Sequence, residues 1–353
     1  MSGVLPFTAL VGQERLKLAL QMLAVDPGLG GVLIRGEKGT AKSTAARALA
    51  DLLPAVRVNA GCHYGCPADR PSVWCDECRE RNQHETTLRQ AGFETLPLGV
   101  TEDQLLGTLD LEHALSRGEQ RFRPGILARV NQGVLYVDEV NLLDDHIVDL
   151  LLDVAAMGVN RVAREGIRVS HPAELMLVGT MNPEEGELRP QLLDRFGLCV
   201  EVTALTDPEE RAEVVMRRLA FDAGPDAFRA QWQDEQAAIT RRIAEARSLV
   251  RDVTVERAFC LAAAELSLEL GVDGQRADVL LVKSAVTLAA LDGRAELRLD
   301  DLERAAAVVL PHRLVERSAP VGEEQEARAR SAAALQGRVK RALQLRSGEK
   351  KKP

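Results

Sequence analysis

The chain has 353 residues, enough for about two domains, and its composition of 46% hydrophobic and 28% charged residues excludes a disordered chain. A net charge of −8 and an aromatic content of 3% disfavour nucleic acid and anionic membranes as partners, because phosphate attracts basic surfaces and base stacking needs rings. The sequence has neither the ~18 uninterrupted apolar residues of a membrane span nor a signal-peptide pattern, so we expect a cytoplasmic protein with no membrane partner.

The first half of the sequence alternates between helical and strand patterns. Val32–Arg35 is a short apolar run typical of a buried strand, and the helical patterns of Gln13–Ala24 and Lys42–Leu53 flank it. Three further strands and a helix are predicted at Val134–Val137, Leu175–Val178, Cys199–Val202 and Asp145–Met157. Short apolar strands separated by helices are typical of a buried parallel sheet, so we predict an α/β domain over residues 1–204.

The pattern changes near residue 205. No strand is evident after Asp207, and residues that start or stop helices divide the sequence into helical segments at 207–221, 225–250, 254–270, 276–292 and 300–309. We therefore predict a smaller all-helical domain over residues 205–317. The charge-rich segment 318–353 predicts a partly disordered tail.

The segment Gly36–Ser43 reads Gly-Glu-Lys-Gly-Thr-Ala-Lys-Ser and lies between a predicted strand and a predicted helix, as a phosphate-binding loop does. Lys42 is expected to reach the β- and γ-phosphates of ATP, and Ser43 to ligate Mg²⁺. Ala41 replaces the second glycine of the motif, which the backbone tolerates if its φ is negative. A simple glycine turn is the alternative. The predicted nucleotide contacts of this loop are Gly36, Gly39, Thr40, Ala41, Lys42, Ser43 and Thr44.

Four further polar residues follow or precede predicted strands. Asp138 can hold the water shell of Mg²⁺ and Glu139 can polarise the attacking water, with a helix N-cap as the alternative. Asn182 can orient that water or touch the γ-phosphate, with an Asn-Pro turn as the alternative. Arg195 can stabilise charge on the γ-phosphate, with an intramolecular salt bridge to Asp194 or a neighbour as the alternative.

Four of the six cysteines lie in the polar loop 61–83, with the spacing Cys62-x₃-Cys66-x₈-Cys75-x₂-Cys78. In a reducing compartment such cysteines are thiols or metal ligands rather than disulfides. Four thiolates can bind structural Zn²⁺ tetrahedrally, and metal binding would supply the ordering energy that a loop with few apolar residues lacks. Zinc is therefore our interpretation of this spacing.

Other interpretations of the cysteines stay open. His63 or His84 could replace one cysteine, and an iron–sulfur cluster, free thiols or a redox-labile pair are alternatives to zinc. Cys199 and Cys260 lie in apolar strand and helix patterns, so we predict that both belong to the core.

These motifs, in this order and followed by a helical domain, resemble the AAA+ ATPases and more narrowly the I subunit of magnesium chelatase. The resemblance covers roughly residues 5–317. The runs that carry it are Leu10–Glu14, Leu96–Asp103, Asp138–Leu143, His146–Val154 and Asn182–Gly197. It implies an AAA+ P-loop NTPase domain with a parallel sheet between helices, followed by a helical lid and sensor domain.

The resemblance also implies roles for single residues. Arg195 would be an arginine finger acting on ATP bound to the adjacent subunit of a hexameric ring, and Asn182 would be the first sensor. Arg276 would be the second sensor, with an exposed arginine at a helix start as the alternative. The family carries insertions before the Asp-Glu strand and before the first sensor, and a hairpin expected around Val162–Val169 fits the second of these places.

The implied function is an ATP-hydrolysing motor that drives Mg²⁺ insertion into a tetrapyrrole, with ATP and Mg²⁺ as cofactors. The implied partners are a second AAA+ subunit with an integrin-type domain and a large tetrapyrrole-binding subunit. Co²⁺ is an alternative metal cargo. A second hypothesis is an AAA+ remodelling chaperone that activates another metalloprotein together with an integrin-type partner. A DNA-translocating ring is disfavoured by the negative charge and the few aromatic residues.

Overall fold

The computed structural model describes residues 3–314 apart from 38, 82, 84, 111–112, 114–115, 117–120, 165–166 and 273, and only the backbone of residues 164 and 167. The predicted tail at 318–353 and the alternative ligand His84 lie outside the described residues. Within this described part, no helix combines the length and apolar content needed to cross a bilayer.

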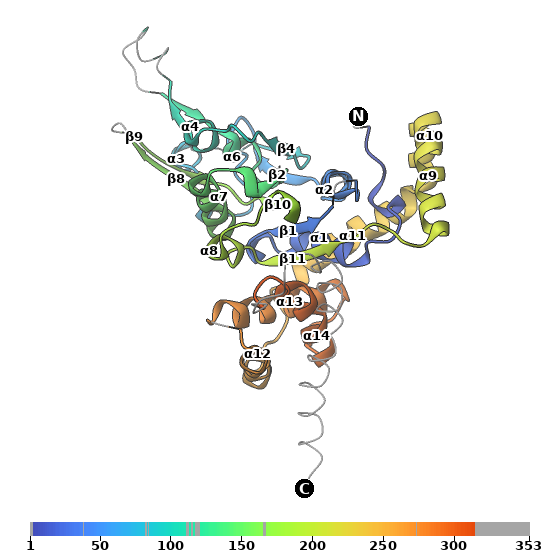
Figure 1. The fold of residues 1–353 in the computed structure, drawn as a ribbon. Helices are drawn as coiled ribbons and strands as arrows, with labels where there is room; N and C mark the ends of the chain where they lie inside the picture. Colours follow the sequence, from blue (N-terminus) through green and yellow to red (C-terminus); the bar gives the residue numbers. More distant parts are fainter. Residues whose placement is uncertain are drawn as a thin grey trace.

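A five-stranded parallel sheet lies at the centre of the first domain (Figure 1). Its strands, in spatial order, are β11 Leu198–Val202, β1 Val32–Gly36, β10 Met176–Met181, β7 Val134–Val137 and β4 Phe93–Leu96. The predicted parallel sheet is confirmed, but the prediction lacked β4. This edge strand pairs with β7 alone and contains the polar residues Glu94 and Thr95, so it has no continuous apolar run.

Helices cover both faces of the sheet because successive strand residues point to opposite sides. Val32 and Ile34 of β1 pack with α1 Glu14–Val25 and α2 Lys42–Ala50, whereas Leu33 packs on the opposite face with α7 Asp145–Met157. Two short helices, α4 Glu102–Leu106 and α6 Ile126–Arg129, join α7 on that face. The sheet is therefore buried on both sides, as its apolar strands predicted.

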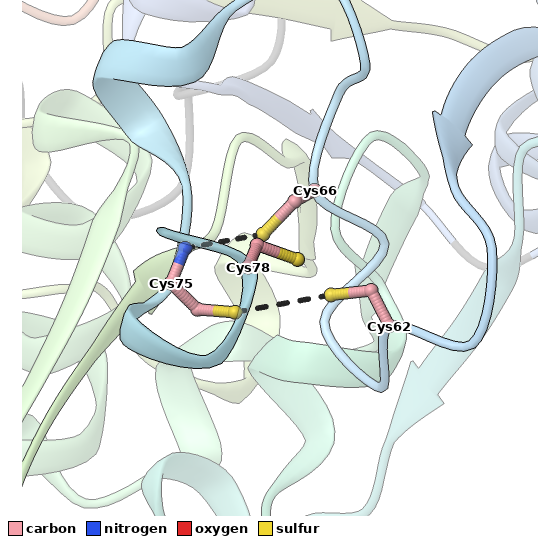
Figure 2. A group of neighbouring side chains, drawn as sticks. All are labelled: Cys62, Cys66, Cys75 and Cys78. Carbon is pink, nitrogen blue, oxygen red and sulfur yellow. Dashed lines mark hydrogen bonds between the residues drawn. The ribbon is translucent and has the colours of Figure 1, made fainter. Parts of the chain in front are cut away.

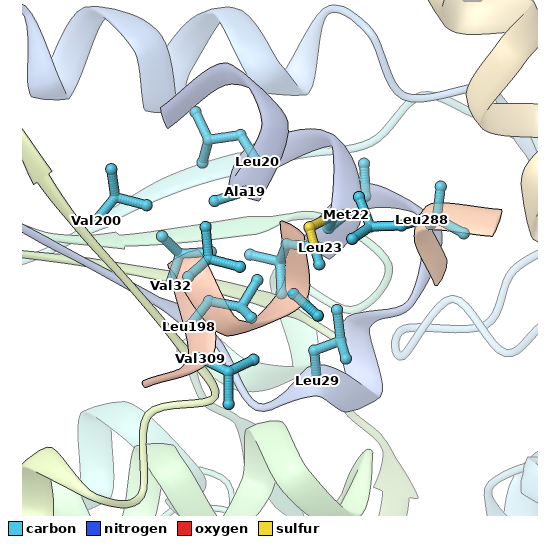
Figure 3. Packing of buried hydrophobic residues seen from close by; sticks show 14 of the residues in the cluster. Ala19, Leu20, Met22, Leu23, Leu29, Val32, Leu198, Val200, Leu288 and Val309 are labelled. Carbon is cyan, nitrogen blue, oxygen red and sulfur yellow. The ribbon is translucent and has the colours of Figure 1, made fainter. Parts of the chain in front are cut away.

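The chain becomes helical after β11, which confirms the predicted all-helical region. The helices are α9 Pro208–Ala223, α10 Pro225–Gln231, α11 Gln233–Leu249, α12 Arg257–Leu270, α13 Arg276–Leu291 and α14 Leu299–Val309. Helices α11 to α14 share a core with the sheet, and Figure 3 shows Leu288 of α13 and Val309 of α14 in this core with Leu23 of α1 and Leu198 of β11. These four helices therefore pack on the face of the sheet that α1 and α2 also cover, whereas Phe221 of α9 and Phe228 of α10 belong to a separate cluster with Ala9.

Short elements extend from the sheet on the side away from α9 and α10 (Figure 1). Antiparallel pairs join β2 Val56–Asn59 to β3 Thr86–Arg89, β5 Gly107–Leu109 to β6 Phe122–Pro124, and β8 Val159–Arg164 to β9 Ile167–Pro172. The remaining elements are α3 Asp76–Glu80, α8 Pro190–Leu193, and 3₁₀ turns at Phe7–Ala9, Pro27–Leu29, Pro71–Val73, Val140–Leu142 and Pro183–Glu185. The predicted hairpin is confirmed, with Val162 opposite Val169.

The two remaining cysteines have different surroundings. Cys199 is fully buried in β11, as predicted, and burial raises the pKa of its thiol to about 12. The prediction for Cys260 was wrong, because this residue is exposed. The buried stripe of α12 contains Phe259, Ala263 and Leu266, so Cys260 falls beside the stripe rather than in it.

Two buried side chains after α14, His312 and Arg313, join the helical region to the backbone of residues 194–197. Arg313 donates to Asp194 O at 2.8 Å and Gly197 O at 3.2 Å, and its Nε lies 3.1 Å from Asp194 Oδ1. Burial lowers the pKa of Arg313 to about 10, which is still well above neutral pH, so the guanidinium stays charged. Burial also holds the pKa of His312 well below its ordinary value, and its Nε2 donates to Phe196 O at 3.0 Å.

We predict that Arg313→Ala lowers the free energy of unfolding by about 2–4 kcal/mol, because it leaves the buried carbonyl acceptors without their charged donor. The midpoint of urea-induced unfolding measures the change. Arg218→Ala is the control, since the pair between Arg218 and Asp222 is half-exposed and its loss is expected to cost less than about 0.5 kcal/mol. Equal effects of the two substitutions would show that the contacts of Arg313 with residues 194–197 do not stabilise the fold.

Candidate functional site

A pocket of about 560 Å³ lies at the carboxyl ends of β1, β10 and β7. The order of strands places these three ends next to one another, and ligands of open parallel sheets bind at this edge. Its lining residues are Gly39, Thr40, Ala41, Lys42, Ser43, Thr44, Tyr136, Asp138, Glu139, Thr180 and Asn182. The structure thus brings the predicted loop, the acidic pair and Asn182 to one pocket, whose volume suits a nucleotide.

The loop between β1 and α2 can bind phosphate. Gly36 begins it, and a Cβ at this position would overlap the carbonyl oxygen of Val202 on the neighbouring strand, so the close strand pairing requires glycine. The Lys42 ammonium donates to Gly36 O and, at 2.9 Å, to Glu37 O. Burial lowers the pKa of Lys42, while Asp138 and the other nearby carboxylates act in the opposite direction. The donor set, a lysine at a helix N-terminus, fits an anionic phosphate chain.

The backbone at Ala41 differs from the expectation. Its φ is 61° and its ψ is 21°, so the condition of a negative φ is not met. Ala41 is the N-cap of α2 and reverses the chain direction between the loop and the helix, a geometry that glycine adopts without strain. An alanine in this left-handed region costs about 1–2 kcal/mol. The loop therefore keeps the shape of the motif at the expense of local strain.

A hydrogen-bonded network holds the acidic pair after β7. Asp138 Oδ1 accepts from Tyr136 Oη at 2.8 Å and from Thr180 Oγ1 at 2.7 Å, so neither bond uses Oδ2. The Glu139 N–H donates to Thr180 Oγ1 at 3.1 Å. Burial raises the pKa of Tyr136, which keeps its hydroxyl protonated as a donor. Thr180 therefore connects β10 to both acidic residues.

Asn182 lines the pocket and is 5% exposed. Its Oδ1 accepts from the N–H of Glu184 at 3.3 Å, at the start of the 3₁₀ turn Pro183–Glu185. The turn that we gave as the alternative is therefore present, and it coexists with the position of Asn182 in the pocket. The turn fixes the side chain at the end of β10.

Arg195 and Arg276 lie elsewhere, and neither is among the residues that line the pocket. Arg195 forms ion pairs with Asp149 and Asp153 of α7, which is the intramolecular alternative, although the partners are not Asp194. Arg276 is exposed at the start of α13 and donates to Arg195 O at 2.9 Å. The two arginines therefore share one surface of the chain.

Sequence reasoning missed Tyr136, Thr180 and the acidic partners of Arg195. The spacing of Asp149 and Asp153 is a signal that was available, because residues four apart lie on the same face of a helix. Tyr136 lies within the apolar run of β7, and Thr180 follows the predicted strand Leu175–Val178. The role of the Thr180 hydroxyl depends on Asp138 at the end of the neighbouring strand.

The structure also brings the four loop cysteines together. Their sulfur atoms all lie within 4.8 Å of one another, and His63 is not part of this group. Hydrogen bonds from Cys66 and Cys75 hold the pKa of the Cys62 thiol well below its ordinary value, whereas the hydrogen bond with Cys62 raises the pKa of Cys66. This group is separate from the pocket described above.

A phosphate-binding loop, an acidic pair on a neighbouring strand and an attached helical region define a P-loop protein of the AAA+ class. Two family profiles match the chain: "Magnesium chelatase, subunit ChlI" over residues 6–189 and "AAA lid domain" over residues 260–331. The chain belongs to the magnesium chelatase I subunit family.

Relatives and solved structures agree with this assignment. The chain is 49% identical to a "Magnesium-chelatase subunit ChlI homolog" of Methanocaldococcus jannaschii, over 89% of this chain and 86% of that protein. It is 48% identical to the magnesium-chelatase subunit ChlI of Synechocystis sp., over 88% of each. A cryo-EM-based structure of the complex between subunits BchI and BchD of magnesium chelatase is 49% identical, with a TM-score of 0.54 over 90% of this chain and 98% of that one.

A further structure supports the fold alone. It is a putative ATPase from Cytophaga hutchinsonii with 18% identity and a TM-score of 0.60, covering 93% of this chain and 90% of that one.

We predict that Ala41→Gly raises the free energy of unfolding by about 0.5–1 kcal/mol, because relief of left-handed strain exceeds the added entropy of the unfolded glycine chain. Ala48→Gly, in the buried interior of α2, is the control and is expected to lower it by at least about 1 kcal/mol. Urea unfolding of both variants measures the two changes. A loss of stability in Ala41→Gly would contradict the conformation of the loop.

If the pocket hydrolyses ATP, we predict that Thr180→Val lowers the rate by about 10–100-fold, because Asp138 and the Glu139 backbone lose the hydroxyl that positions them. Thr180→Ser keeps the hydroxyl and is expected to stay within about threefold of the parent rate. Steady-state phosphate release measures both. Equal rates for the valine and serine variants would show that the network does not position the acidic pair.

Proposed function

We propose that this chain is the ATP-hydrolysing motor subunit of a metal chelatase. The observation that carries the proposal is the single pocket that contains the phosphate-binding loop, Asp138, Glu139 and Asn182 in a chain of the magnesium chelatase I subunit family. ATP is the substrate, and Mg²⁺ would neutralise charge on its β- and γ-phosphates.

Each residue of the pocket has a distinct role in this proposal. When ATP binds, the Lys42 ammonium leaves the carbonyl oxygens of Gly36 and Glu37 and contacts the β- and γ-phosphates. The backbone of Gly39 to Thr44 surrounds these phosphates. Ser43 and Asp138 hold Mg²⁺, directly or through its water shell. Glu139 orients the attacking water and accepts its proton, and Asn182 at the end of β10 completes the water's environment.

The positions of Arg195 and Arg276 favour assembly into a ring. Neither arginine lines the pocket of its own chain, which supports a role for each at a phosphate in an adjacent subunit. Asp149 and Asp153 hold Arg195 until the neighbour's nucleotide replaces them. We propose a homo-oligomeric, hexameric ring with a nucleotide at each seam. In this ring Arg195 is the arginine finger and Arg276 the second sensor.

Hydrolysis in this ring would drive insertion of Mg²⁺, or alternatively Co²⁺, into a tetrapyrrole held by a large partner subunit. The similarity to the BchI and BchD complex supports a second AAA+ subunit as a direct partner, and we propose that this partner carries an integrin-type domain. We place the reaction in the cytoplasm. In this scheme this chain is the motor, and the large partner subunit provides the tetrapyrrole site.

A mixing experiment tests the shared seam. Lys42→Ala and Arg195→Ala are each expected to abolish ATP hydrolysis, because one loses the phosphate ligand and the other the finger. Mixed in equal amounts, they are expected to regain about a quarter of the parent rate, since one seam in four combines an intact pocket with an intact neighbouring arginine. The control mixes Lys42→Ala with Glu139→Gln, which share one pocket and should not complement.

Failure of the first mixture, or full activity of a monomer at saturating ATP and Mg²⁺, would contradict the ring. The cargo is tested by purifying the protein with its bound partners and following the absorption spectrum of a porphyrin or corrin precursor after ATP and either metal are added. Recovery of only an unrelated metalloprotein, with no tetrapyrrole-binding subunit, would favour a remodelling chaperone instead.

A further inference from the structure

We infer that Cys62, Cys66, Cys75 and Cys78 form a structural zinc site that folds the insert formed by residues 61–83. Figure 2 shows the four side chains converging from two separate turns of the chain. The inference does not rest on the proposed ATPase activity, because none of the four residues lines the nucleotide pocket.

The geometry suits one tetrahedral metal ion. The sulfurs all lie within 4.8 Å of one another, so by geometry some point lies within about 2.9 Å of all four. Zinc binds thiolate at about 2.3 Å, which corresponds to sulfur separations of about 3.8 Å in a tetrahedron. Cys62 Sγ and Cys75 Sγ are already 3.9 Å apart. An inward movement of at most about 0.6 Å for each sulfur would therefore complete the coordination shell.

The same distances disfavour the other interpretations. An iron–sulfur cluster spreads its four thiolates over more than one iron, which requires wider separations than a single ion does. A disulfide requires sulfurs about 2.05 Å apart, far closer than the 3.9 Å between Cys62 and Cys75. Four sulfurs that all lie within 4.8 Å of one another, rather than in two separate pairs, favour a shared central cation.

The protein around the sulfurs is arranged for thiolates. The backbone N–H of Cys75 donates to Cys66 Sγ at 3.2 Å, which stabilises negative charge on that sulfur. Arg81 places its guanidinium beside the first turn, donating to Ala60 O at 2.9 Å and Gly61 O at 3.2 Å. A zinc ion with four thiolates carries a net charge of −2, which this arginine offsets in part. Cys62 is half-buried and leaves a route for the metal to enter.

The insert has only a small core of its own. Its core cluster contains Tyr64, three buried cysteines and Ala128, so the cysteines supply most of the buried side chains. Coordination would supply the folding free energy that such a small core cannot. The site therefore has a structural role, since four protein ligands leave no open position for a substrate.

Contacts of the insert show what the metal would position. The ring of Tyr64 stacks on His171 of β9 at 4.5 Å between centroids. Asn131 donates to Tyr64 O at 2.8 Å and accepts from Glu174 N at 3.0 Å. Asn131 and Glu174 precede β7 and β10, the strands that end at the nucleotide pocket. The folded insert thus packs against the starts of both strands, at the opposite end from the pocket.

The first test is the metal content of the full chain purified under reducing conditions without chelator. We expect about one zinc per chain by mass spectrometry, and an X-ray absorption shell of four sulfurs at about 2.3 Å. Titration with a mercurial should release the zinc as the thiols react. A folded protein with less than about 0.2 metal per chain and reactive thiols, or with iron and acid-labile sulfide, would overturn the inference.

A variant pair localises the metal. Cys75→Ser/Cys78→Ser is expected to lower the zinc content at least about fivefold, whereas Cys260→Ser, at an exposed cysteine outside the group, should keep it. Nucleotide binding by the zinc-free protein is expected to stay within about threefold of the parent, because the site is remote from the loop at Lys42. Unchanged zinc in the double variant would place the metal elsewhere. If the double variant does not fold, the measurements on the parent protein still decide.

Discussion

The adjacency of β1, β10 and β7 in one parallel sheet is the constraint on which the candidate site depends. Successive residues of each strand are buried against different helices, so a slip of one residue would move Leu33 and its equivalents to the wrong face. Burial on both faces therefore specifies the register strongly. The register in turn places the loop at Lys42, the acidic pair and Asn182 at one edge. Packing of apolar side chains is thus what positions the polar ones.

The helical region contributes to a different surface. It shares its core with α1 on one face of the sheet, and its last described residues hold the backbone of residues 194–197 through Arg313 and His312. Arg195 belongs to this fixed loop and pairs with α7 rather than with the pocket. Arg195 is not among the residues that line the pocket of its own chain. Under the proposed function, this separation is the physical reason for a ring.

The sequence was most informative where short-range chemistry decides the structure. The loop that opens α2 follows from residue type and spacing, and β1 and β7 from continuous apolar runs. It was least informative where a long-range contact decides. The hydroxyl of Thr180 matters only because β10 lies beside β7, and β4 forms only because β7 offers it an edge. The left-handed φ of Ala41 likewise reflects the loop as a whole, since residue preference alone favours the opposite sign.

The cysteine insert depends both on a short-range sequence pattern and on a contact between separate turns of the chain. Its spacing predicts a metal ligand set from the sequence, but the meeting of the four sulfurs depends on a turn at Cys62 and the start of α3 at Asp76. The insert contacts its surroundings through polar groups, since Arg70 pairs with Glu174 and Asn131 donates to Tyr64 O. If zinc supplies the ordering energy, the insert can fold as a local unit and then pack on β9 through Tyr64. Such a unit would be added to the motor without altering the register of the sheet, because its contacts lie at the strand starts and the nucleotide pocket lies at their ends.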